Sequence, residues 1–146
     1  MEYRILDPRP MSFAEALVPE DPWRHDLARP LGYRYGAPYI DDPHRTTSWL
    51  LVALPSASLE RWYHHEPNGR LTCDAISWRA EDQDRAEAMS RTLLAGGSLW
   101  PVMALDIGFD YAWMIDGFHR AGASLIAGSP EIRAHLLIGQ RPAGAT

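Results

Sequence analysis

The stretch that most constrains the fold of this chain runs from Ala112 to Gly128 and passes through a polar corner at Asp116–Arg120. Residues 113–115 are large and apolar, which predicts a buried strand, and the small residues 121–127 predict a helix. Gly117 permits a tight turn with positive φ between them. A strand that turns directly into a helix presents free backbone N–H groups and the positive end of the helix dipole. We therefore expect an anion site at this corner, and a phosphate is the simplest occupant.

Length and charge narrow the classes of protein to which the chain can belong. With 146 residues, including six Trp and six Tyr, it has enough apolar side chains for one domain with a buried core. The net charge of -5 argues against binding nucleic acid by electrostatics alone, because that requires a concentrated basic face. All 14 basic residues are arginine, the residue suited to forked contacts with carboxylate or phosphate. Codon bias in a genome rich in G and C explains this excess more simply.

Cysteine content and the start of the chain suggest a compartment. The single cysteine, Cys73, excludes an internal disulfide framework and cannot form a zinc site unaided. The first residues have neither the basic nor the apolar region of a signal peptide, and no apolar run approaches the length of a membrane span. We expect a soluble, cytoplasmic protein.

Seven prolines in residues 1–47 exclude a long helix or a central strand there. Only Ser12–Val18 predicts a short helix, in which Ser12 and Glu15 form a capping box. Because aromatic residues alternate with the prolines, we expect an arm that wraps over the core rather than disorder. A partner-binding surface is the alternative interpretation.

The regular part of the chain alternates between strand and helix patterns, which predicts an α+β domain. The helix prediction is clearest for residues 81–95, where Ala86, Met89, Leu93 and Leu94 lie near one face and the acidic first turn indicates a solvated face. The elements expected in chain order are a strand at 48–55, a short helix at 58–64, a strand at 71–78, the helix at 81–95, strands at 100–105 and 111–115, the helix to about 127 and a strand at 133–138.

This order of elements, together with Trp100-Pro101-Val102 and Met114-Ile-Asp-Gly-Phe-His-Arg-Ala-Gly-Ala123, resembles the ParB/sulfiredoxin-like fold. That family contains α+β nucleotide-binding domains of plasmid-partition proteins, sulfiredoxin and free serine kinases. The resemblance covers residues 48–139, which leaves a proline-rich arm at 1–47 and a flexible tail at 140–146. It implies that nucleotide phosphates bind at the corner, with Gly117, His119 and Arg120 on the phosphate side.

Departures from the family pattern indicate which branch the corner is similar to. Phe118 stands at the position of the catalytic cysteine of sulfiredoxin, so the resemblance does not extend to that repair chemistry. Partition proteins continue into a helix-turn-helix domain, for which this chain has few residues left, so sequence-specific DNA binding is not expected. The corner looks closest to free serine kinases, which place a catalytic glutamate after the first strand. Glu66 is the residue matched to it, with Glu60 as the alternative.

Each candidate site residue also has a plain structural interpretation. Asp116 can bind Mg²⁺, act as a base or orient His119, or it can simply cap the following helix. His119 can donate to a phosphate or act as a general acid, or it can hold the turn through a backbone carbonyl. Arg70, after the turn at residues 67–69, can reach a phosphate or remain a surface arginine. His64, His65 and Glu66 resemble a metal-ligand cluster, but adjacent side chains point in different directions.

The sequence thus predicts a nucleotide-binding protein that acts as an NTP-dependent phosphotransferase or NTPase. The expected ligands are a nucleoside triphosphate or diphosphate, such as ATP, ADP or CTP, with Mg²⁺ at Asp116 and a small-molecule phosphate acceptor. One alternative is a non-catalytic regulatory module of a plasmid or phage system that binds a protein partner through the arm. Another is a ParB-like DNA-binding protein or nuclease, which the acidic net charge disfavours.

Overall fold

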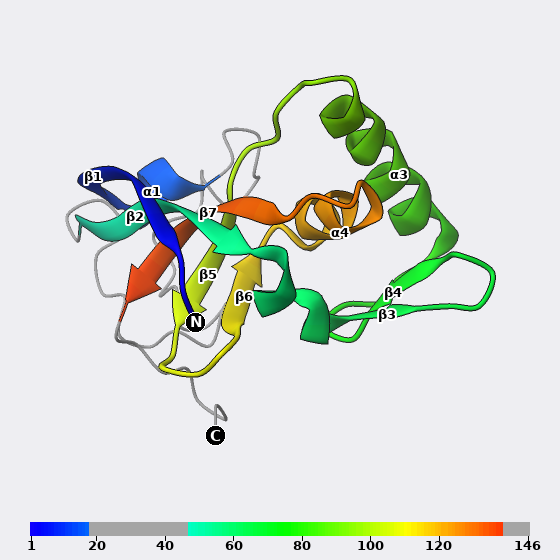
Figure 1. Ribbon diagram of the computed structural model, residues 1–146, viewed down its shortest axis with the longest axis horizontal. Helices are drawn as coiled ribbons and strands as arrows, with labels where there is room; N and C mark the ends of the chain where they lie inside the picture. Colours follow the sequence, from blue (N-terminus) through cyan, green and yellow to red (C-terminus); the bar gives the residue numbers. More distant parts are fainter. Residues whose placement is uncertain (18–46, 139–146) are drawn as a thin grey trace.

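A mixed five-stranded sheet forms the centre of the computed structural model, which describes residues 1–17 and 47–138 (Figure 1). The neighbours β7 and β5 are parallel, and every other adjacent pair in this sheet is antiparallel. The helices and a separate two-stranded hairpin lie outside the sheet, so the predicted α+β class is confirmed. The order of strands across the sheet is β1 (Arg4–Ser12), β2 (Thr47–Pro55), β7 (Glu131–Ile138), β5 (Val102–Asp106) and β6 (Ala112–Asp116).

Three α-helices are described, and two of them cross each other beside the sheet (Figure 1). The short α1 (Phe13–Ala16) begins with the predicted capping box, in which Ser12 and Glu15 bond each other's backbone. The other two are α3 (Ala80–Leu94), close to the predicted bounds, and α4 (Phe118–Ile126). None of the helices in the described ranges is long and apolar enough to cross a membrane.

The segment after β2 differs from the prediction. Residues 58–64 do not form one helix: the 3-10 turns η2 (Ser56–Ser58) and η3 (Glu60–Trp62) are followed by the strand β3 (Tyr63–His65). The turn that follows folds β4 (Leu71–Cys73) back on β3, which pulls residues 63–65 into extended pairing. The predicted strand at 71–78 therefore ends at Cys73, opposite Tyr63, where its partner strand begins.

The first strand is a second difference from the prediction. Although residues 4–12 were assigned to the arm, they pair with β2 as an edge strand of the sheet. Pro8 and Pro10 are tolerated because an edge strand has one side without a ladder, and the register shifts between Asp7 and Met11. The remainder of the predicted arm and the predicted tail lie outside the described residues.

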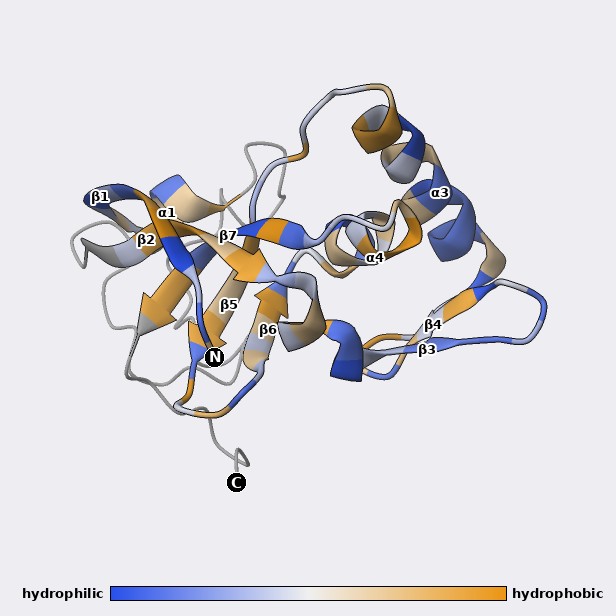
Figure 2. Cartoon of the chain, viewed as in Figure 1, coloured by the Kyte–Doolittle hydropathy of each residue, from blue (hydrophilic) through white to orange (hydrophobic). Residues whose placement is uncertain are grey.

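The sheet is covered on both faces, and β5 shows this most directly. Val102 and Ala104 belong to the apolar cluster that also contains Ala121 of α4, whereas Met103 and Leu105 belong to the cluster that contains Phe13 of α1. Burial on both faces explains why the strand sequence is continuously apolar rather than alternating. Figure 2 shows this as apolar colouring along the central strands.

Helix α3 packs on α4 with small and polar residues rather than with the predicted apolar face. Its buried positions are Gln83, Ala86 and Ser90, whereas Leu94 is 70% exposed. Among the residues of the predicted face, Ala86 is thus confirmed as buried, and Leu94 is not. The small side chains let α3 approach α4 closely, and this approach determines the surroundings of the corner.

Candidate functional site at the start of helix α4

The corner between β6 and α4 has the conformation that its glycine suggests. Gly117 is the N-cap of α4 with φ +97° and ψ +30°, in the left-handed region, and its N–H donates to Asp116 Oδ1 over 2.9 Å. Helix α4 begins at Phe118, three residues before the predicted start. His119 and Arg120 are therefore part of the first helical turn rather than of a loop ahead of it.

Close packing gives a second reason for glycine at this position. A Cβ atom added to Gly117 would lie 2.9 Å from Val102 Cγ1 and 3.0 Å from Arg120 Nη2. The start of β5 and the guanidinium of Arg120 thus occupy the space that a side chain would need. The corner is packed inside the fold on this side.

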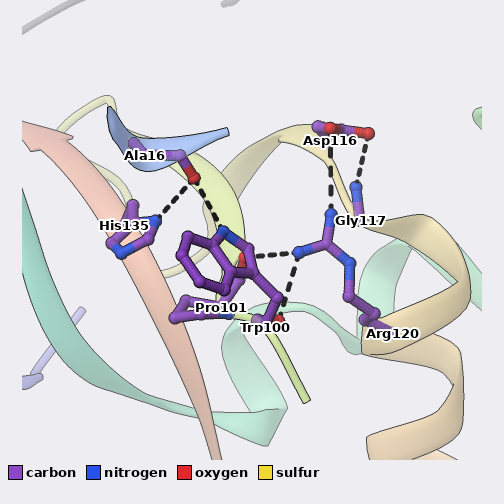
Figure 3. A network of polar contacts seen from close by, with 7 residues as sticks. All are labelled: Ala16, Trp100, Pro101, Asp116, Gly117, Arg120 and His135. Atoms are coloured by element: carbon purple, nitrogen blue, oxygen red, sulfur yellow. Dashed lines mark hydrogen bonds and ion pairs between the residues drawn. The ribbon is translucent and has the colours of Figure 1, made fainter. Parts of the chain in front are cut away.

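Arg120 holds the corner to the segment before β5 (Figure 3). Its Nη1 donates to the carbonyl oxygens of Trp100, over 3.1 Å, and Pro101, over 2.5 Å. Its Nη2 lies 3.8 Å from Asp116 Oδ2, and the side chain is only 11% exposed. In this structure the guanidinium supports the backbone around the corner instead of extending toward solvent.

The same contacts continue to the first helix, as Figure 3 shows. The carbonyl oxygen of Ala16 accepts a hydrogen bond from Trp100 Nε1 over 3.0 Å, and His135 Nδ1 lies 2.8 Å from it. Burial lowers the pKa of His135, although its bond to Ala16 acts in the opposite direction. One polar network therefore connects α1, β7, the loop before β5 and the corner.

His119 faces α3 rather than the Arg120 network. Its Nε2 lies 2.7 Å from Asp82 Oδ1, and its ring stacks on Trp78 with centroids 5.4 Å apart and planes at 26°. The backbone N–H of Arg79 also donates to Asp82, over 2.7 Å. The bond from Arg79 is the larger cause of a lowered pKa of Asp82, and the bond to His119 is the next. The imidazole ring is thus fixed in the first turn of α4, and 24% of the His119 side chain is exposed.

Asp82 and Trp78 are site residues that the sequence interpretation missed. The acidic first turn of the helix at 81–95, to which Asp82 belongs, was predicted to form a solvated face. The capping position of Asp82 near the start of α3 is readable from sequence, but its contact with a histidine 37 positions away is not. Only the crossing of α3 and α4 brings the two side chains together.

Glu66 and Arg70 lie together but not at the corner. They close the loop between β3 and β4, where Glu66 N–H donates to the Arg70 carbonyl oxygen over 2.7 Å, and both side chains are exposed. Figure 1 shows this loop projecting away from the sheet, well apart from the start of α4. The alternative residue, Glu60, is exposed in η3. The role of Glu66 or Glu60 as a base and the role of Arg70 as a phosphate ligand stay predictions.

Metal ligation is a poor fit to the residues at these positions. Asp116 supplies one carboxylate, which already accepts from the N–H of Gly117 and lies beside the Arg120 cation. His64 pairs with Asp74 across the hairpin over 2.8 Å, and His65 and Glu66 do not join it. Across residues 1–17 and 47–138, no three His, Cys, Asp or Glu side chains gather as a metal site would require.

Comparisons with known proteins give a structural likeness of low identity. No protein-family model and no curated protein matches the chain. Among solved structures, the chain is similar to the crystal structure of sulfiredoxin from Arabidopsis thaliana, with 20% sequence identity and a TM-score of 0.42. The similarity covers 61% of this chain and 85% of that one. At this identity and TM-score it carries no inference about activity, so the proposals below rest on this chain's own residues.

Proposed function

We propose that the chain binds a nucleotide through its phosphates at the first turn of α4, with His119 as the side chain that contacts them. The observation that carries the proposal is the fixed position of His119, held by Asp82 and Trp78 at the start of a helix whose N-cap is a left-handed glycine. Phosphates are suited to this place because first-turn N–H groups have no acceptor within the helix and face the positive end of its dipole.

The pair of His119 and Asp82 determines which ring nitrogen meets the ligand. Because Nε2 lies against the carboxylate, Nε2 carries a proton and Nδ1 is left for the ligand. A protonated Nδ1 donates to a phosphate oxygen, and a neutral one accepts a proton from a nucleophile. Stacking on Trp78 fixes the plane of the ring, so little rotamer freedom remains to be lost on binding.

Binding is better supported than catalysis. The phosphotransferase or NTPase activity would require a base near the phosphates. Glu66 belongs to the loop between β3 and β4, which lies well apart from the start of α4 (Figure 1). Arg120 is engaged with two carbonyl groups, so contact with a phosphate would require it to exchange partners. Mg²⁺ would arrive as the nucleotide complex, held mainly by phosphate oxygens, since residues 1–17 and 47–138 offer no ready set of ligands for it.

The position of Glu66 away from the corner and the engagement of Arg120 with two carbonyl groups favour one alternative. This alternative is a regulatory module that binds nucleotide without turning it over. Incubation with ATP or CTP and Mg²⁺, followed by ³¹P nuclear magnetic resonance, separates the two functions. Release of inorganic phosphate that is lost in His119→Ala would establish turnover at this site. Binding with no change in the phosphate spectrum would establish the regulatory form.

Isothermal titration with ATP, ADP and CTP, each with and without Mg²⁺, tests the binding itself. His119→Ala should weaken the affinity for the preferred nucleotide by about tenfold or more, because a charge-assisted hydrogen bond is lost. The matched control is His64→Ala, which removes another histidine paired with an aspartate, but on the exposed hairpin. The proposal fails if the wild-type chain binds none of the three, or if both variants bind equally well.

A further inference from the structure

Tyr63 of β3 carries a buried hydroxyl group to the first turn of α4. The residue is 5% exposed, and its Oη donates to the carbonyl oxygen of Phe118 over 2.6 Å. Burial raises the pKa of Tyr63, and a hydrogen bond from the backbone N–H of Gly122 acts in the opposite direction. Phe118 and Gly122 are the residues whose backbone groups bond each other in a regular helical turn. The hydroxyl group therefore lies beside the first hydrogen bonds of α4.

The carbonyl group of Phe118 and the N–H group of His119 belong to one peptide unit. In a trans peptide the two groups point in opposite directions, and the N–H groups of a helix point toward its start. The N–H of His119 is one of the first-turn donors that have no acceptor within the helix. A hydrogen bond to the carbonyl oxygen polarises the peptide unit and strengthens its N–H as a donor. Tyr63 thus acts on a donor available to a phosphate, from the side opposite to the phosphate.

The aromatic ring of Tyr63 leads to the side chain of the same histidine. It meets Trp78 edge to face, with centroids 6.2 Å apart and planes at 90°, and Trp78 in turn stacks on the imidazole of His119. Gly122 leaves the space for this packing, because a Cβ there would lie 3.2 Å from Trp78 Cη2 and 3.4 Å from Tyr63 Cε1. One residue of the hairpin is therefore connected to both the backbone and the side chain of His119.

We propose that Tyr63 is a positioning residue of the phosphate site. Its hydroxyl group orients and polarises the peptide unit between Phe118 and His119, so the affinity for nucleotide depends on how the hairpin of β3 and β4 packs on α4. This inference rests on the proposed function and adds to it a residue that does not touch the ligand. Because the hydroxyl group acts through a peptide unit, its loss weakens nucleotide binding without abolishing it.

Tyr63→Phe removes the hydroxyl group and keeps the ring, and Ser58→Ala is the matched control. Ser58 is 2% exposed, and its Oγ donates to the carbonyl oxygen of Pro55, also over 2.6 Å. It lies in η2, which bonds the loop after α4 through the N–H of Ser56 and the carbonyl oxygen of Pro130. Each variant loses one buried hydroxyl donor, so both should unfold at a lower urea concentration than the wild type.

Nucleotide titration and nuclear magnetic resonance separate positioning from a purely structural role. Tyr63→Phe should weaken affinity for the nucleotide that the wild type prefers among ATP, ADP and CTP by about threefold to tenfold, whereas Ser58→Ala should bind it as the wild type does. In the free full chain labelled with ¹³C and ¹⁵N, Tyr63→Phe should shift the carbonyl signal of Phe118 and the amide signal of His119. Ser58→Ala should leave both signals in place.

Three results would overturn the role of Tyr63 alone, in a wild-type chain that binds nucleotide. These are unchanged affinity in Tyr63→Phe, unchanged signals of Phe118 and His119 in that variant, and an equal loss of affinity in Ser58→Ala. The last result would show that lost stability by itself lowers affinity. A wild-type chain that binds none of the three nucleotides would overturn the proposed function and this inference together.

Discussion

Gly117 combines two constraints that substitution can separate. Gly117→Ala places a Cβ at positive φ and also within 3.0 Å of Val102 and Arg120, so we expect it to destabilise the fold by about 2 to 4 kcal/mol. Gly69→Ala is the matched control, since Gly69 has φ +83° but no atom within 4 Å of the added Cβ. Its cost should stay near 1 kcal/mol, the backbone part alone. Urea unfolding measures both, and equal losses would show that the clash at Gly117 relaxes freely.

How far the sequence predicts a residue depends on how local its constraint is. The positive φ of Gly117 was predictable, because a glycine between a strand and a helix permits a tight turn with this conformation. The environment of Arg120 was not, because its guanidinium bonds carbonyl oxygens 19 and 20 positions away. Asp82 was missed for the same reason, since only tertiary packing shows that it meets His119. Local geometry could thus be predicted at this site, whereas the partners of its charged side chains could not.

Secondary-structure elements, too, were predictable where local sequence determines them and not where tertiary pairing does. The helix at 80–94 was predictable from its own composition, and the strands β5 and β6 ahead of the corner from their apolar runs. The strand β3 was not, because residues 63–65 become extended only through pairing with β4. The strand β1 was missed because its prolines disfavour a central strand, yet an edge position accommodates them.

The junction of α3 with the hairpin depends on one buried amide. Gln83 is 5% exposed, and its Oε1 accepts from the N–H of Leu71 and the Nε1–H of Trp78, each over 3.1 Å. Gln83→Leu leaves both donors without this acceptor, so we expect a loss of about 2 to 4 kcal/mol in the free energy of unfolding. Arg85→Leu, a similar change on the exposed side of α3, should cost less than about 0.5 kcal/mol.

Loosening this junction should also disturb the proposed phosphate site, because Trp78 both stacks on His119 and donates a hydrogen bond to Gln83. Near-ultraviolet circular dichroism reports the packing of Trp78, and nucleotide titration reports the site. An unfolding loss in Gln83→Leu similar to that of Arg85→Leu would show that water replaces the amide and that the junction does not depend on it.

At the scale of the whole molecule, His135 connects the N-terminal helix to the central sheet and is a buried group that acid should destabilise. It is 4% exposed, bonds the carbonyl oxygen of Ala16, and senses the cations Arg120 and Arg133. Burial lowers its pKa below the ordinary 6.5, so below pH 6.5 the unfolded chain binds a proton more readily than the folded one. Stability should therefore be fully present above pH 6.5 and decrease as the pH falls through the folded-state pKa of His135.

Denaturant unfolding at several pH values between 5 and 8 measures this dependence. One such histidine contributes a slope of at most about 1.4 kcal/mol per pH unit. His135→Asn retains an N–H donor near the Ala16 carbonyl but does not titrate, so it should have lower stability at neutral pH and a flatter slope below pH 6.5. Subtracting one profile from the other removes the contribution of every other histidine to the pH dependence of stability. Carboxylates with lowered pKa, such as Asp82, lose their contribution to stability only at more acidic pH. Parallel profiles would mean that acid acts on the fold elsewhere, and that the bond between His135 and Ala16 survives protonation.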